Sequence, residues 1–380
     1  MSDIVFILGA GASKEVNAPL MAEFLDEADS LRKIGKVPEA IEDFNRVFEA
    51  RSRLQSVYSK SYVDLNNVES VFAAFEMAKT LGVFAEYKKS EIDNLIESMK
   101  ILIVKTLEKK IKFKVKKNDI ISHDVYNDFV NLFIYFLKDS EPKYSISVIT
   151  FNYDIALDYA LNNRIQYSYC LDGSINQRIL PLLKLHGSLN WGDCPKCRKI
   201  VEWDFNRYMQ KHRLDLVGKY QDFNEETIIP IGSSIQEYKH SCGNNLNANP
   251  IIVPPTWNKT EYHRSISKVW RVAANELSNA EYIFVIGYSY PESDYFFHYL
   301  YALGSIGNNT LKSFWVFDPN ADKLKDHYLT LLGLGAKDRF EILPNTFSEA
   351  VKILAEYFKK KISIRQLSDK KRISRLSKSI

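Results

Sequence analysis

The sequence predicts an α/β protein with a doubly wound parallel sheet, a large helical insertion and a small irregular module. Short apolar runs recur along the chain, and such runs are typical of strands that are buried on both faces. Segments of about ten residues or more with helical character separate many of these runs, as in sheets whose crossovers are helices. A glycine-rich turn follows the first run directly.

The expected strands are short, and the expected helices lie between them. We expect strands at 4–8, 145–150, 182–185, 251–253, 282–286 and 314–317. We expect helices after the first strand and at 154–161, 265–277 and 293–303, then another helix and a last β-α pair. Because strands and helices alternate, the sheet should be parallel.

The 380 residues exceed the size at which one core usually keeps growing, so we expect one large domain with insertions or two domains that share a cleft. We divide the chain into an α/β domain at 1–20 and 145–358, a helical insertion at 21–144, a small module at 191–250 inside the α/β domain, and a basic tail at 359–380. The insertion contains no clear strand signal. One of its helices is marked by Asn66 as a cap, Glu69 three residues later, and an apolar face. That face comprises Val68, Val71, Phe72 and Phe75.

Composition indicates a folded chain: 46% of residues are hydrophobic and 26% are charged. No apolar run reaches the roughly 18 residues of a membrane span, and the start of the chain does not fit a signal peptide, so we expect a cytoplasmic protein without a membrane partner. The formal net charge is +4, yet the tail alone holds nine Lys or Arg and one acid. This tail could contact nucleic acid or an acidic partner, or it could be a solvated helix end.

The loop after the first strand is a candidate phosphate-binding turn. It comprises Gly9, Ala10, Gly11, Ala12 and Ser13. Glycine permits a tight turn and a close approach of the backbone to a pyrophosphate, and amides at a helix start attract its charge. The dehydrogenase fingerprint of Rossmann-like sheets needs a third glycine where this chain has Lys14, so hydride transfer is disfavoured.

Three further polar segments follow expected strands. They are T-F-N-Y-D at 150–154, L-H-G-S at 185–188 and I-G-Y-S at 286–289. In open α/β sheets ligands bind beyond the carboxyl ends of the strands, so these segments are expected to converge on the glycine loop.

G-A-G-A-S, T-F-N-Y-D, L-H-G-S and I-G-Y-S, in this order, resemble the GAG, QN-x-D, HG and G-T/S-S elements of the sirtuin NAD-binding fold. The resemblance covers roughly residues 1–20, 145–190 and 250–320. It implies NAD as the bound cofactor. It further implies that the loop at 9–13 cradles the phosphates with Phe151 nearby, that Gly287 and Ser289 line the adenosine side, and that Asp318 and Asn320 lie near the adenine ribose.

The same resemblance implies three catalytic residues. Asn152 is similar to the asparagine beside the nicotinamide ribose, Asp154 to the aspartate that holds the carboxamide, and His186 to the histidine that acts as general base on a ribose hydroxyl. The residue types fit the chemistry, because histidine has an unperturbed pKa of ~6.5, close to working pH. A histidine in an L-H-G-S turn can also be a satisfied structural residue.

Departures from the sirtuin pattern bear on the substrate. Sirtuin deacylases carry an arginine and a phenylalanine after the GAG loop, and the segment at 16–20 contains neither. The F-N-Y-D and L-H-G-S variant is similar to bacterial sirtuin-like proteins that degrade NAD in anti-phage defence. We therefore expect an NAD glycohydrolase that releases nicotinamide and ADP-ribose. The alternatives are a regulatory subunit that senses NAD or ADP-ribose for a HerA-type ATPase or a nuclease, and a protein deacylase.

A second candidate site contains cysteine and histidine. Cys194 and Cys197 have metal-knuckle spacing, and His240 and Cys242 could complete a structural zinc site. Lys239 stands where a fourth cysteine would be, so a loop with free thiols is the alternative. Aromatic residues make up 13% of the chain, and an aromatic run at 288–299 is expected to serve the core and a homo-oligomer interface. The alternative is that these rings stack on nucleic-acid bases.

Overall fold

The computed structural model describes residues 2–55, 62–117, 119–140, 143–217, 225–253, 260–291, 294–304 and 311–359. Its centre is a seven-stranded sheet of order β14-β13-β12-β1-β4-β6-β5, and every pairing in it is parallel. The strands are β1 (Ile4–Leu8), β4 (Ile146–Thr150), β5 (Tyr167–Ser168), β6 (Leu180–Lys184), β12 (Tyr282–Ile286), β13 (Ser313–Phe317) and β14 (Phe340–Leu343). The predicted fold class is confirmed.

The sheet reverses its winding at β1. After β1 the chain builds β4 and β6 on one side, and later β12, β13 and β14 on the other. The register places Leu8 opposite Thr150 in β4 and Ile286 in β12, so the three strands end at the same level. A reversal of this kind leaves a crevice beyond the carboxyl ends of the central strands, where the loops diverge.

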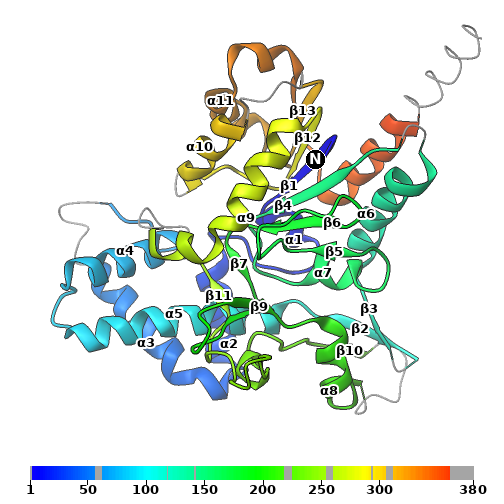
Figure 1. Cartoon of the computed structure of the whole chain (residues 1–380). Coiled ribbons are helices and arrows are strands. Elements are labelled where there is room, and N and C mark those ends of the chain that lie inside the picture. Colours follow the sequence, from blue (N-terminus) through cyan, green and yellow to red (C-terminus); the bar gives the residue numbers. More distant parts are fainter. Residues whose placement is uncertain are drawn as a thin grey trace, which may run out of the picture.

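Helices cover both faces of the sheet (Figure 1). On one face, Phe6 of β1 contacts Phe129 of α6 (Asp124–Ile134), with ring centroids 5.1 Å apart. The helix at 347–359 covers the same face, because Phe358 contacts Phe284 of β12. On the other face, Phe314 contacts helices α10 (Tyr295–Gly304) and α11 (Ala321–Leu331). Helix α9 (Thr260–Asn279) packs against α10 and β6.

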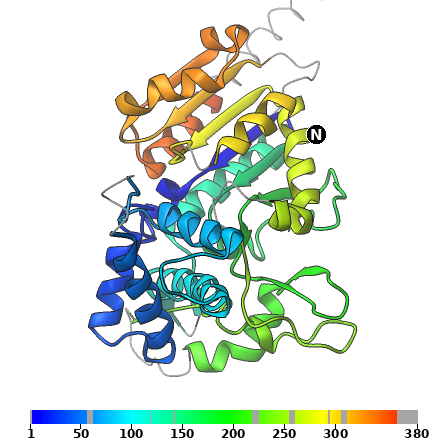
Figure 2. The ribbon, with the colours of Figure 1, turned by 90° about the vertical axis from the view of Figure 1, so that its left-hand side faces the viewer.

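The segment between β1 and β4 is largely helical. Most of its helices gather below the sheet in both ribbon views, whereas α6 lies against the sheet (Figures 1 and 2). The segment's helices before α6 are α1 (Ala10–Lys14), α2 (Phe24–Lys33), η1 (Pro38–Ala40), α3 (Ile41–Leu54), α4 (Val68–Leu81) and α5 (Lys89–Lys110). The expectation of an insertion without strands is wrong. Strands β2 (Phe113–Lys116) and β3 (Asp119–Ile121) form a hairpin, and β10 (Glu225–Thr227) pairs with β2. The alternation of buried Phe113 and Val115 with exposed lysines is the period-two signal of this strand.

Helix α4 begins one residue later than expected. Its cap is Asn67, whose side-chain oxygen accepts hydrogen bonds from the amides of Glu69 and Ser70. Asn66 does not cap the helix, because its side-chain oxygen accepts a hydrogen bond from Arg51 instead. The expected apolar face is confirmed: Val68, Val71, Phe72 and Phe75 are all buried.

The module at 191–250 is more regular than expected. It contains β8 (Trp191–Asp193), β9 (Ile200–Glu202), α8 (Phe205–Val217), β10 and η4 (Ile235–Glu237). The expected strand at 251–253 exists as β11 (Ile251–Ile252), but it lies outside the main sheet and pairs antiparallel with β7 (Gly187–Ser188). Two elements elsewhere are the π-helical η3 (Tyr135–Asp139) and η6 (Leu334–Arg339).

No helix in the described part of the chain is long and apolar enough to cross a membrane. The expected helix at 293–303 corresponds to α10, and its first expected residue lies outside the described residues. The basic tail beyond residue 359 also lies outside them.

Candidate functional site

A cavity of about 370 Å³ lies at the carboxyl ends of the central strands, within the range of roughly 300–1,000 Å³ that is common for small-molecule sites. The loops after β1, β4, β6, β12 and β13 all contribute to it, as does the start of the helical segment. Of the residues singled out from the sequence, those that line the cavity are Ala10, Gly11, Phe151, Asn152, His186, Gly287, Ser289, Asp318 and Asn320. Motifs far apart in the sequence therefore meet around one space.

Four of the singled-out residues are not among those that line the cavity: Gly9, Ala12, Ser13 and Asp154. Ala12, Ser13 and Asp154 are buried, at 0%, 1% and 5% exposure. Ala12 and Ser13 lie in the short helix α1 (Ala10–Lys14), and Asp154 lies just before α7 (Ala156–Leu161). Ala12, Ser13 and Asp154 are therefore buried next to the residues that line the cavity.

Asn152 has a defined orientation. Its side-chain nitrogen donates to the Gly9 carbonyl at 2.8 Å and to Ser13 Oγ at 3.0 Å. Because a carbonyl can only accept, the nitrogen must face Gly9 and the amide oxygen must face the other way. Asn152 also lines the cavity.

The Ser13 hydroxyl has its full set of hydrogen bonds inside the protein. It donates to Asp154 Oδ2 at 2.7 Å, so its one proton is used. It accepts from Asn152, and it lies 2.9 Å from the Tyr126 hydroxyl, which must then donate. Burial raises the pKa of Tyr126 well above its usual value, and the nearby Asp154 raises it further, so the phenol keeps its proton. Ser13 and Asp154 thus hold Asn152 in place.

Close backbone contact explains the glycines of the first loop. A Cβ on Gly9 would lie 2.5 Å from the Tyr288 Cα, and one on Gly11 would lie 2.7 Å from the Gly287 Cα. The Gly11 amide donates to the Gly287 carbonyl at 2.8 Å. The loops after β1 and β12 therefore touch, and both can reach the same ligand.

His186 lies at the turn between β6 and β7 and is 3% exposed. Its Nε2 is 3.0 Å from Asp294 Oδ1, and Asp294 is equally buried. The second oxygen of Asp294 accepts a hydrogen bond from the Tyr288 hydroxyl at 3.1 Å. The Phe151 ring lies edge-on to the imidazole at 5.1 Å. The imidazole thus lies between a carboxylate and aromatic rings at the cavity wall.

Tyr288 joins the aromatic wall to the carboxylate. Its ring stacks on Phe151 with centroids 4.2 Å apart. Burial raises the pKa of Tyr288 well above its usual value, and the Asp294 charge adds to the effect. The phenol therefore stays protonated and donates to Asp294, which fixes the carboxylate beside His186.

Among the described residues that line the cavity, acids outnumber bases. The carboxylates are Glu69, Asp294 and Asp318, and the one lysine is Lys14. The Lys14 ammonium pairs with Glu23, and the hydrogen bond with Lys14 lowers the pKa of Glu23. Such a lysine can exchange this partner for an anionic group of a ligand.

Sequence reasoning missed Asp294 and did not place Glu69 in the site. Asp294 follows the I-G-Y-S segment by five positions, in a loop without a recognised motif. Glu69 carried only a capping signal, and its place in the cavity depends on how the helical segment docks.

A buried ion pair lies behind the site. Lys184 at the end of β6 pairs with Asp158 of α7 at 3.1 Å, with both side chains at most 3% exposed. The Lys184 ammonium also donates to the Asp154 carbonyl at 2.5 Å, and Tyr169 donates to Asp158 at 2.6 Å. These bonds satisfy charges that would be costly to bury alone. They tie the loop that carries Asn152 to the strand that leads to His186.

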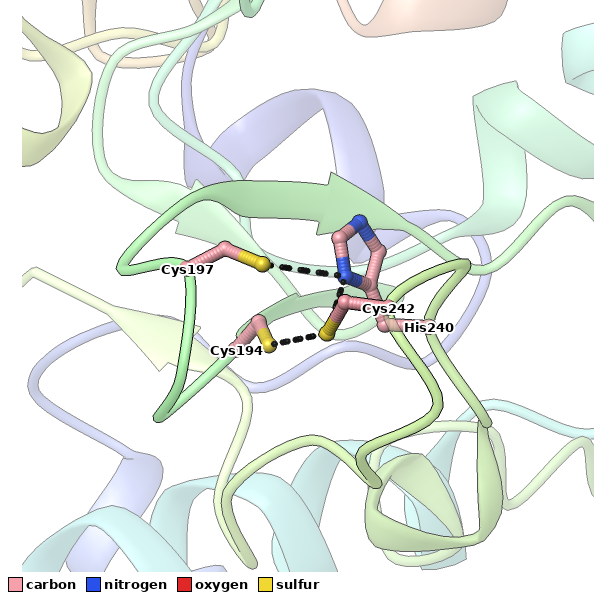
Figure 3. A group of neighbouring side chains, drawn as sticks. All are labelled: Cys194, Cys197, His240 and Cys242. Atoms are coloured by element: carbon pink, nitrogen blue, oxygen red, sulfur yellow. Dashed lines mark hydrogen bonds between the residues drawn. The ribbon is translucent and has the colours of Figure 1, made fainter.

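Cys194, Cys197, His240 and Cys242 form a second cluster, away from this cavity (Figure 3). Their ligand atoms all lie within 4.8 Å of one another, so the group could hold a metal ion. A tetrahedral zinc with Zn–S bonds of about 2.3 Å requires ligand separations of roughly 3.8 Å, and the 3.4 Å between the sulfurs of Cys194 and Cys242 is close to this. The predicted ligand set therefore comes together, and three cysteines with one histidine suit zinc.

Solved structures similar to this chain are of Sir2 enzymes. Sir2Tm bound to a propionylated peptide shares 12% identity, with 93% of this chain and 92% of that chain covered and a TM-score of 0.34. A structure described as the basis for the mechanism and regulation of Sir2 enzymes shares 14% identity, with 94% of each chain covered and a TM-score of 0.39. Sir2 in complex with the inhibitor EX-527, 2′-O-acetyl-ADP-ribose and a deacetylated p53 peptide shares 12% identity, with 93% of each chain covered and a TM-score of 0.34.

No protein-family model matches the chain, and no curated protein matches it. Identities of 12–14% with these TM-scores do not identify the substrate or the activity of this chain.

Proposed function

We propose that the protein is an NAD glycohydrolase that cleaves NAD to nicotinamide and ADP-ribose. The observation that carries the proposal is the meeting of the glycine loop, Asn152 and His186 around one cavity beyond the carboxyl ends of the sheet. This is where a doubly wound sheet binds its ligand. The motif resemblance in these loops supports NAD as that ligand.

The reaction breaks the bond between C1′ of the ribose and the nicotinamide nitrogen, and the bonding electrons leave with nicotinamide. Water oxygen bonds to C1′, and its proton is lost to a base. Positive charge develops on the sugar during this step, and the carboxylates of Glu69 and Asp294 lie in the cavity to stabilise it. No redox partner is needed.

His186 is the base in this proposal, and it acts on a ribose hydroxyl or on the water. When it takes a proton it becomes a cation, and the Asp294 carboxylate 3.0 Å away stabilises that charge. Asn152 lines the cavity, and in this proposal its side-chain oxygen orients the ribose or the water. Lys14 is the cation available to the pyrophosphate.

The test is incubation of the purified chain with NAD, followed by chromatography of the products. Nicotinamide and ADP-ribose should accumulate in equal amounts, and Asn152→Ala or His186→Ala should reduce the rate by about 100-fold or more. His327→Ala is the matched control, because His327 lies on α11 and is not among the residues that line the cavity. Unchanged turnover in both site variants would refute the mechanism.

A role in anti-phage defence is part of the proposal and rests on the motif variant. Cells that express the chain should lose NAD during infection and survive as a population, and cells with His186→Ala should not. NAD binding without turnover under any condition would favour the sensor for a HerA-type ATPase or nuclease. Turnover that requires an acyl-lysine peptide would favour the deacylase.

We also propose that the protein is cytoplasmic and forms a homo-oligomer. Aromatic side chains on α10, Phe296 at 48% and Tyr299 at 56% exposure, are the surface that would contribute to self-association. Light scattering after size exclusion, with a Tyr299→Ala variant for comparison, measures the assembly directly.

A further inference from the structure

A second cavity, of about 710 Å³, lies at the opposite edge of the sheet. Ser2 precedes β1, Ser145 precedes β4 and Leu180 begins β6, and all three line this cavity. Because the strands are parallel, these residues mark the amino ends, whereas the candidate NAD site lies at the carboxyl ends. The length of the five-residue strands, about 3.3 Å per residue, separates the two cavities.

Glu276 of α9 lines this cavity and has an exposed fraction of 0%. Neither of its carboxylate oxygens has a hydrogen-bond partner among the described residues. A buried carboxyl group without partners is costly, and proteins normally satisfy such groups with hydrogen bonds, ions or ligands. No group in the described part of the chain donates a hydrogen bond to the Glu276 carboxylate, so a ligand could do so.

The other charged residues of the described lining are cations. Lys138, Arg164 and Arg178 all line the cavity and are exposed, and Glu276 is the only acid among the described residues that line it. The Arg164 guanidinium is held in place by Asn127 and Asn131. The lining thus combines one buried acid with three exposed cations. This combination disfavours a simple anion beside Glu276 and a simple polycation beside the cations.

We propose that this cavity binds a small zwitterion, with a cationic nitrogen group against Glu276 and an anionic group toward Lys138, Arg164 and Arg178. Two unpaired oxygens on one carboxylate suit a guanidinium that donates two parallel hydrogen bonds, or an ammonium that bridges them. The cavity volume falls in the range of roughly 300–1,000 Å³ for small-molecule sites. Amino acids with basic side chains have this chemistry.

Calorimetric titration of the full chain with L-arginine and L-lysine tests the proposal. At least one should bind with a Kd below about 1 mM. For the amino acid that binds, an analogue without the cationic group should not bind, and an analogue without the carboxylate should bind more weakly. For arginine these analogues are L-citrulline and agmatine. Binding should persist in His186→Ala, because His186 lines the other cavity. If neither amino acid binds, the proposal is wrong.

Variants locate the binding site. Glu276→Gln keeps the side-chain shape and removes the charge, so it should weaken binding by about 30-fold or more. It should also raise the melting temperature of the ligand-free chain, because it removes an unpaired buried carboxylate. Glu281→Gln is the matched control, since Glu281 pairs with Lys312 outside the cavity. Equal binding in Glu276→Gln and Glu281→Gln would overturn the assignment.

Discussion

Asp294 is the residue on which the proposed chemistry depends and which no sequence motif indicated. It holds one oxygen beside His186 and the other beside Tyr288, and it is buried. Its negative charge would stabilise a protonated His186, while its shape alone would only position the ring.

Asp294→Asn separates these two effects, because it keeps the shape and removes the charge. We expect NAD turnover to fall by about 100-fold or more with little change in KM. The measurement is a pH profile of kcat and KM for both proteins. Turnover within a factor of about two of wild type at every pH would show that Asp294 is a packing residue only.

Glu108 of α5 makes the stability of the fold depend on pH. Burial raises its pKa from 4.5 to about 7, although Ser233 donates hydrogen bonds to both of its oxygens. The folded state therefore keeps a proton that the unfolded state loses above pH 4.5. The contribution of Glu108 to the free energy of unfolding is therefore largest below pH 4.5. It falls as the pH rises and is lost above about pH 7.

The size of this loss is roughly 3 kcal/mol, from a shift of about 2.5 units at 1.36 kcal/mol each. Glu108→Gln cannot titrate. Its amide oxygen can accept from the Ser233 amide, and its amide nitrogen can donate to the Ser233 hydroxyl in place of the bond that the hydroxyl donates to Glu108. The free energy of unfolding of wild type relative to this variant should thus decrease between pH 4.5 and 7. Parallel pH curves for the two proteins would contradict a raised pKa.

At the scale of elements, contact between the loops after β1 and β12 shapes the site. Gly287 has a φ of 60°, and a Cβ there would lie 2.3 Å from the Ala12 amide nitrogen. Gly82, at the end of α4, has a similar φ of 67° but no atom within 4 Å of such a Cβ. A comparison of alanine substitutions at Gly82 and Gly287 therefore distinguishes the cost of backbone strain from the cost of steric overlap.

Gly82→Ala should cost about 1 kcal/mol of stability, the usual strain of the left-handed region. Gly287→Ala should cost roughly 2 kcal/mol more, because the two loops must move apart. It should also weaken NAD binding. Chemical denaturation of both variants measures the difference, and equal costs would mean that the loops do not touch.

The cysteine and histidine cluster makes a prediction about the module at 191–250. The purified chain should contain about one equivalent of zinc, and Cys242→Ser should lose it. Cys170→Ser is the control, because Cys170 is a buried thiol outside the cluster. A chelator should lower the melting temperature of wild type, since metal binding stabilises the folded module. Metal-free wild-type protein of equal stability would contradict a structural metal.

At the scale of the whole molecule, the sequence predicts the sheet well because its strands are buried on both faces. The runs at 4–8 and 282–286 match β1 and β12 residue for residue, and neither strand contains a charged residue. Strands β2 and β11 are harder to predict from the sequence. The first is short and half-exposed, and the second pairs only with a two-residue strand.

The candidate site was predictable where a strand carries a motif to its end, as for Asn152 and His186. Glu69 and Asp294 could not be predicted, because their positions depend on how the helical segment and the loop after β12 close over the cavity. The sirtuin resemblance implies that Asp154 holds the carboxamide, and in this structure its carboxylate accepts hydrogen bonds from Ser13 and the Ala156 amide.

A crystal structure of His186→Ala with NAD tests the central claim most directly, since the variant should bind NAD without consuming it. The account predicts the pyrophosphate beside Ala10 and Gly11, and the nicotinamide ribose between Asn152 and residue 186. NAD bound elsewhere on the molecule, or no NAD in this cavity at saturating concentration, would contradict it.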